Sequence, residues 1–143
     1  MTMAVVLAAV VPLYVAGDAA RDRVVMRALE RQYRAGGNPE SVYIESGPGV
    51  PPGLAAVGRQ PVEVVTRDEL QTRHAGKPTA PALTTVFVRA ERGLLGVRYA
   101  VSVSSSAVMV PGATSWPLGG SHTYYFRQWA GLPWGVGDVF TAF

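Results

Sequence analysis

The chain of 143 residues carries a formal net charge of +3, with 48% hydrophobic and 16% charged residues, and it contains no cysteine. This balance excludes a solvated disordered chain, and the missing thiols exclude disulfide scaffolds, thiol catalysis and thiolate metal centres. The length is that of one domain, and 16 glycines with 11 prolines predict many turns instead of a helical bundle.

The first seventeen residues contain no charged side chain, and Ala4 to Val11 is a continuous apolar run that ends at Pro12. Three interpretations stay open: a secretory signal, a membrane anchor, or a buried segment of this domain or of an interface. We therefore divide the chain into an apolar segment, residues 1–17, and a single domain, residues 18–143. We expect a membrane-associated or exported protein, and a cytoplasmic location stays open.

The next segment predicts the main helix of the domain. Asp18 is a good N-cap, and Val25, Leu29 and Tyr33 repeat at four-residue intervals before a Gly-Gly-Asn-Pro stretch stops the pattern at residues 36–39. Such spacing places the apolar side chains on one face of a helix. We predict that this face packs on a sheet.

The same segment holds the whole net charge of the chain, because residues 21–34 contain five arginines and two acidic residues. Arg23, Arg27 and Arg31 recur every four residues and therefore share one helix face. Guanidinium groups bind phosphates and anionic headgroups, so one hypothesis is an anion-binding or lipid-binding stripe. A solvated helix face is the favoured alternative, and the lack of interleaved aromatic residues argues against nucleic acid.

Several later segments show the alternation of half-buried strands, and Arg92 to Gly96 and Ala130 to Pro133 are turns between pairs of them. A polar loop, residues 71–81, is predicted after the second strand. A helix followed by such strands needs to lie on one face of their sheet. We predict an α+β fold with one main N-terminal helix packed on an antiparallel meander sheet of four to six strands. These segments are Ser41–Glu45, a strand around Val62 and Val64, Thr84–Glu91, Val97–Ser106, His122–Trp129 and Trp134–Phe143.

The closing hairpin carries a family resemblance. The run Tyr124-Tyr125-Phe126-Arg127-Gln128-Trp129, followed by a turn and Trp134-Gly135-Val136, resembles the last hairpin of cystatin-like and NTF2-like α+β domains. With the preceding hairpin, the resemblance covers about a third of the chain. NTF2-like folds enclose a pocket with several N-terminal helices, whereas this sequence predicts one such helix.

The chain offers little for catalysis or metal binding. His74 and His122 lack the spacing of paired metal ligands, and we predict that both lie in loops and that no metal or cofactor is bound. The NTF2-like resemblance implies one possible catalytic group, an Asp138 base with Tyr99 or Tyr125 as proton donor. A solvent-facing Asp138 is the favoured alternative.

Aromatic residues are concentrated near the C-terminus, and Trp, Tyr and Arg are enriched at binding hot spots. We expect a non-enzymatic accessory or structural module that binds protein partners in a larger assembly, with association of that assembly with a membrane left open. One alternative is a small NTF2-like enzyme or carrier for an apolar small molecule, and another is binding of anions or lipid through the arginine stripe. The predicted partner-binding residues are Trp116, Tyr125, Arg127, Trp129 and Trp134.

Overall fold

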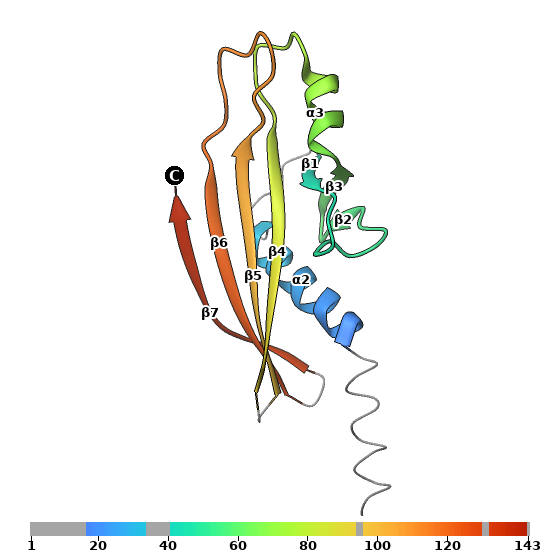
Figure 1. The fold of residues 1–143 in the computed structure, drawn as a ribbon, viewed down its shortest axis with the longest axis vertical. Helices are drawn as coiled ribbons and strands as arrows, with labels where there is room; N and C mark the ends of the chain where they lie inside the picture. The colour runs from blue at the N-terminus through green and yellow to red at the C-terminus, as the bar shows by residue number, and fades with distance from the viewer. Residues whose placement is uncertain (1–16, 34–40, 94–95, 130–131, 143) are drawn as a thin grey trace, which may run out of the picture.

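The computed structural model describes residues 17–33, 41–93, 96–129 and 132–142. Within these residues the domain is α+β: seven strands form one twisted sheet in the order β2-β3-β1-β4-β5-β6-β7, accompanied by the helices α2 and α3 (Figure 1). The predicted α+β class is confirmed. The elements are α2 (Gly17–Tyr33), β1 (Val42–Glu45), β2 (Ala56–Val57), β3 (Gln60–Val65), α3 (Arg67–His74), β4 (Ala82–Gly93), β5 (Gly96–Ala107), β6 (Gly120–Trp129) and β7 (Leu132–Ala142).

Helix α2 lies on one face of the sheet, as its apolar spacing predicts. Val24, Val25, Ala28 and Leu29 are fully buried in the main core, against side chains from β1 and β3 to β6. The helix already includes Gly17, so Asp18 lies in its first turn and not at the N-cap. A carboxylate in the first turn still interacts favourably with the helix dipole.

Both predicted hairpins are confirmed. Strands β4 and β5 pair antiparallel along their whole length, and β6 continues the meander beside β5. Strand β7 pairs with β6, with a register irregularity between Tyr125 and Phe126. These long strands form the larger part of the sheet and carry most of the core that α2 covers.

The other half of the sheet corrects the prediction of a purely antiparallel meander. Strand β1 lies between β3 and β4 and runs parallel to both of them, so the sheet is mixed. Alternation of apolar residues reports burial of one strand face and carries no information about strand direction. Parallel strands of one sheet need a crossover connection. Helix α3 lies in the connection that leads from β3 to β4, which lies on the far side of β1.

Helix α3 replaces the start of the predicted polar loop at residues 71–81. Thr66 caps its N-terminus by accepting a hydrogen bond from the Glu69 amide at 3.2 Å. Leu70, its one buried residue, packs with Val65, Leu83 and Val108 in a second core cluster. Because Leu83 and Thr84 are neighbours on one strand and face opposite ways, α3 and α2 cover opposite faces of the sheet.

The predicted apolar segment, residues 1–17, lies outside the described residues except for Gly17. Within the described part of the chain, no helix combines the length and the apolar character needed to cross a bilayer.

Candidate functional site

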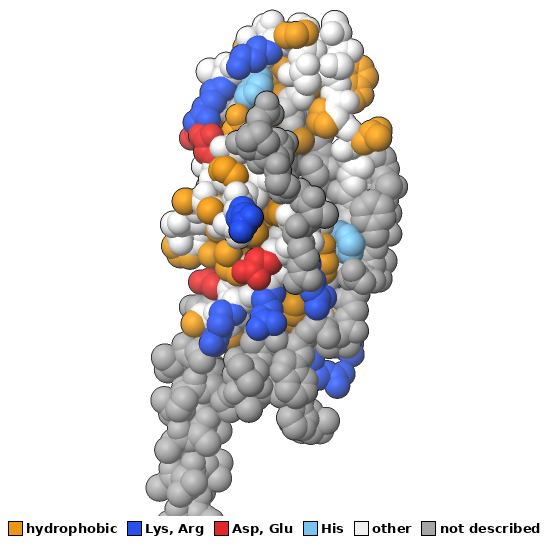
Figure 2. Space-filling view, turned by 180° about the vertical axis from the view of Figure 1, so that it is seen from behind, with side chains coloured by type: hydrophobic (Ala, Val, Ile, Leu, Met, Phe, Trp, Pro, Cys, Tyr) orange, Lys and Arg blue, Asp and Glu red, His pale blue; other side chains and the backbone are white. Residues whose placement is uncertain are grey.

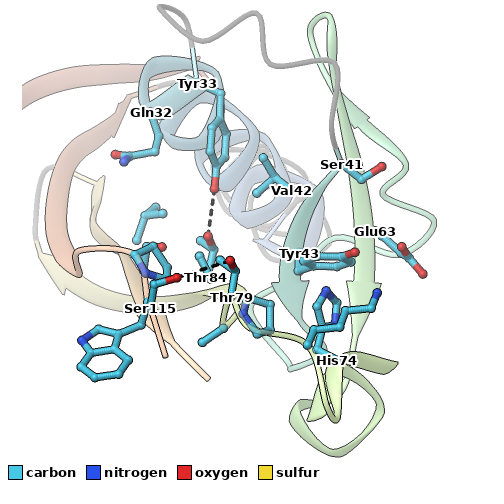
Figure 3. A pocket seen from close by; sticks show the side chains of 18 of the residues that line it. Gln32, Tyr33, Ser41, Val42, Tyr43, Glu63, His74, Thr79, Thr84 and Ser115 are labelled. Atoms are coloured by element: carbon cyan, nitrogen blue, oxygen red, sulfur yellow. Dashed lines mark hydrogen bonds between the residues drawn. The ribbon is translucent and has the colours of Figure 1, made fainter. Parts of the chain in front are cut away.

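An open groove of about 1130 Å³ lies where α2 ends above the sheet (Figure 3). Its floor includes Thr84 of β4 and Val103 and Ser105 of β5. One wall is the last turn of α2, and the opposite wall is built from β1 and the end of α3. The loops before β4 and before β6 close the remaining side, through Lys77 to Pro81 and Ser115 to Pro117.

Hydrogen bonds fix the α2 wall to the sheet. The Tyr33 hydroxyl shares a hydrogen bond of 3.1 Å with the Thr84 hydroxyl across the groove (Figure 3). The Tyr124 hydroxyl donates to the Gln32 side-chain oxygen at 2.8 Å. Both bonds join residues far apart in the sequence, so they hold the end of α2 in one position over the floor.

Tyr33 is the titratable group of the groove whose environment differs most from water. Burial raises the pKa of its hydroxyl above the ordinary value of about 10, and the hydrogen bond to Thr84 offsets part of this rise. The neutral hydroxyl is therefore favoured in the folded protein. Thr84 is itself 3% exposed, so its hydroxyl depends on Tyr33 for a partner in this wall.

We expect Tyr33→Phe to lower the free energy of unfolding at pH 8 by about 1 kcal/mol, because a buried hydroxyl loses its partner. The raised pKa of Tyr33 stabilises the wild-type fold fully below pH 10, and this contribution is lost as pH rises through the folded-state pKa. The gap between wild type and variant should therefore narrow between pH 8 and pH 11, measured by urea unfolding. A gap that stays constant across this range contradicts the assignment.

The opposite wall combines a histidine and a second tyrosine. His74, the last residue of α3, stands edge-on to the Tyr43 ring with centroids 5.8 Å apart. Its Nδ1 is 3.1 Å from the Leu70 carbonyl oxygen. Glu63 on the same side is paired with Arg73, and this hydrogen bond raises the pKa of the Arg73 guanidinium. The Glu63 carboxylate, which lines the groove, is therefore already paired with a cation that does not line it.

Two loops form the outer wall as one unit. The backbone of Pro78 accepts hydrogen bonds from the amides of Thr114 and Ser115, at 2.8 and 3.1 Å. The Ser115 hydroxyl donates to the Thr79 hydroxyl at 3.3 Å. Trp116 follows directly and is 58% exposed at the rim. No buried polar side-chain atom in the described residues lacks a partner.

The predicted partner-binding residues do not share one surface. Trp116 lies at the groove, whereas Tyr125 and Arg127 lie along β6 toward the hairpin at the other end. The backbone register places Trp129 and Trp134 at that hairpin, and their side chains lie outside the described part. In the arginine stripe, Arg23, Arg27 and Arg31 are all exposed, and the Arg31 guanidinium lies 5.7 Å from the centre of the buried Phe126 ring.

The tyrosines offered as partners of Asp138 have different positions. Asp138 pairs across the sheet with Tyr124, while Tyr125 pairs with Gly137. Tyr99 is 4% exposed and belongs to the main core. The Asp138 side chain lies outside the described part, so the structure leaves the implied acid-base pair as a hypothesis.

Both histidines lie in regular elements, which corrects their predicted loop positions. His74 ends α3, and His122 lies in β6 with its ring stacked on Tyr124 at a centroid distance of 4.4 Å. Among the described residues, no group of three or more His, Asp or Glu side chains is placed to hold a metal ion.

Sequence reasoning missed the groove residues Tyr33, Tyr43, Thr84 and His74 as a set. One local signal was present, because Thr66-Arg67-Asp68-Glu69 has the capping-box spacing that begins a helix. That signal would have placed His74 at a helix end, although not opposite Tyr33. No family model, curated protein or solved structure matches the chain.

Proposed function

We propose that the domain is a non-enzymatic binding module whose groove takes an extended, uncharged, partly apolar segment of a partner protein. The observation that carries the proposal is the lining of the groove. Apart from Gln32 and His74, its residues carry hydroxyl, aromatic, proline or aliphatic side chains, with Lys77 and the Arg73-paired Glu63 as the lysine and the carboxylate of the lining.

The chemistry of the lining favours a polypeptide over a compact ligand. The volume of about 1130 Å³ is close to the upper end of the ~300–1,000 Å³ of small-molecule sites, so the groove accommodates either by size. Hydroxyl groups and exposed backbone suit a ligand that offers hydrogen bonds along its length, and an exposed Trp116 at the rim supplies an aromatic contact. Walls that are already held by hydrogen bonds, from Tyr33 to Thr84 and from Thr114 and Ser115 to Pro78, also lower the entropic cost of binding.

The test is selection of random displayed peptides on the full chain, followed by affinity measurement. We expect peptides that bind with micromolar affinity and are uncharged at their centre. Ser105→Trp fills the groove floor and should weaken their binding at least tenfold, roughly 1.4 kcal/mol. Ser104→Trp is the matched control, since Ser104 is the neighbour of Ser105 on β5 and its side chain faces the other side of the sheet. We expect the affinity of this variant for the selected peptides to stay within about twofold of that of the wild type.

A second candidate function is carriage of an apolar small molecule, supported by the Tyr33, Tyr43 and Trp116 rings at the groove. Binding of a neutral naphthylamine dye, measured by its fluorescence, distinguishes peptide binding from carriage of an apolar small molecule. Dye binding that Ser105→Trp abolishes, without any peptide selected by the wild type, supports the carrier. Peptides whose binding is unaffected by Ser105→Trp would place the partner site elsewhere on the domain.

A further inference from the structure

Seven of the twelve arginines of the chain lie toward the end of the molecule opposite the groove. Helix α2 starts there, and the β4–β5 and β6–β7 hairpins both turn there (Figure 1). We call this region the basic end and define it by its seven arginines. They are Arg21, Arg23 and Arg27 of α2, Arg89 and Arg92 of β4, Arg98 of β5 and Arg127 of β6.

The charge of the basic end exceeds that of the whole protein. The segments that meet there, residues 17–27, 89–98 and 127–134, contain these seven arginines and three acidic residues. They are thus more positive than the entire chain, whose net charge is +3. Figure 2 shows a group of blue side chains in the lower part of the described surface, besides others at the top and in the middle. The fold therefore adds the hairpin arginines to those of the helix.

Two of these arginines lie where their like charges destabilise the pairing of two strands. Arg98 and Arg127 lie directly opposite each other on β5 and β6, and like charges in this position destabilise a strand pair. Both are exposed. Glu91 lies directly opposite Arg98 on the other neighbouring strand, β4, and its carboxylate is 3.4 Å from Arg89 in an ion pair, so this one carboxylate is shared between Arg98 and Arg89. An anionic partner that lies between Arg98 and Arg127 would relieve their repulsion.

We propose that the basic end docks on an anionic lipid surface. Two observations favour a membrane over a nucleic acid. The sixteen residues that precede α2 carry no charged side chain, and they join the helix at this end. The register places Trp129 and Trp134 at the same hairpin end, and tryptophan is enriched at membrane–water interfaces. An apolar segment together with a basic patch supplies the two signals that stable membrane binding needs.

This proposal is independent of the groove, which lies at the other end of the domain. It also assigns an orientation: the basic end faces the lipid headgroups, and the groove points away from them toward a partner.

The test compares binding of the full chain to vesicles of phosphatidylcholine with and without phosphatidylglycerol. The neutral vesicles measure the contribution of the apolar residues 1–16, and the ratio of the two affinities measures the charge contribution. We expect Arg98→Gln/Arg127→Gln and Arg23→Gln/Arg27→Gln each to lower this ratio about tenfold or more. Arg67→Gln/Lys77→Gln removes the same charge near α3 and should change the ratio less than about twofold.

Quenching by lipids with brominated chains reports the orientation. We expect Trp116→Phe to keep the quenching of tryptophan emission, and Trp129→Phe/Trp134→Phe to lose most of it. Equal loss of binding in all three charge variants would show a general charge effect and overturn the proposal. Tighter binding to a DNA duplex than to the anionic vesicles at equal salt would overturn the choice of a membrane.

Discussion

Phe126→Ala is expected to lower the free energy of unfolding by about 3–5 kcal/mol, the usual cost of removing a buried aromatic side chain. Phe126 is 1% exposed and heads the largest fully buried side chains of the described core. It packs among the side chains that join α2 to β5 and β6. The cavity left by the ring would lie directly under the helix, so thermal or urea unfolding should report the full loss.

Arg31→Gln separates the core contribution of Phe126 from its contact with the helix arginine. The guanidinium lies over the ring at 5.7 Å, and a cation–π contact at an exposed site is worth about 0.5–1 kcal/mol. We therefore expect Arg31→Gln to cost at most about 1 kcal/mol. A loss in Phe126→Ala no larger than that in Arg31→Gln would show that the ring is not a central core residue.

Leu70→Ala is expected to have the second-largest effect, about 2–4 kcal/mol, because Leu70 is the one buried side chain of α3. It joins the helix to Val65, Leu83 and Val108. Loosening α3 also moves His74, which lines the groove. Peptide affinity for the groove should therefore fall together with stability, measured on the same preparation.

Thr72→Ala is the matched control for the Leu70 variant. Thr72 lies on the exposed side of the same helix, where its hydroxyl donates to the Asp68 carbonyl oxygen at 2.9 Å. We expect its loss to stay below about 0.5 kcal/mol, as for most exposed substitutions. Similar losses in the two variants would contradict the assignment of Leu70 as the anchor of α3.

The sequence predicts well those parts of the fold whose contacts are local in the chain. The hairpins follow from two-residue periodicity and from turn residues, and each strand pairs with the next one along the chain. The main helix follows from the four-residue spacing of Val25 and Leu29. In these elements the periodicity and the burial report the same physical fact.

The parallel part and the groove could not be predicted in the same way. Strand β1 has four residues, and nothing in its sequence states that its neighbours are β3 and β4. The groove combines side chains from α2, β1, α3 and two loops, and its central pair, Tyr33 and Thr84, is separated by 51 positions. Such a site leaves no motif in the sequence, because its residues come together in space only once the order of the strands in the sheet is known.

The position of β1 between two strands that follow it in the chain also sets an order of assembly. Strands β4 to β7 contact their sequence neighbours, so they can pair early at a small cost in loop entropy. Strand β1 needs both β3 and β4 in place, and its pairing with β4 joins residues 40 positions apart, such as Tyr43 and Leu83. The β1 side of the groove therefore forms after the meander, and by the same reasoning it opens at a lower free energy than global unfolding. Ligand entry through that side would need only this partial opening, while α2 and the meander stay folded.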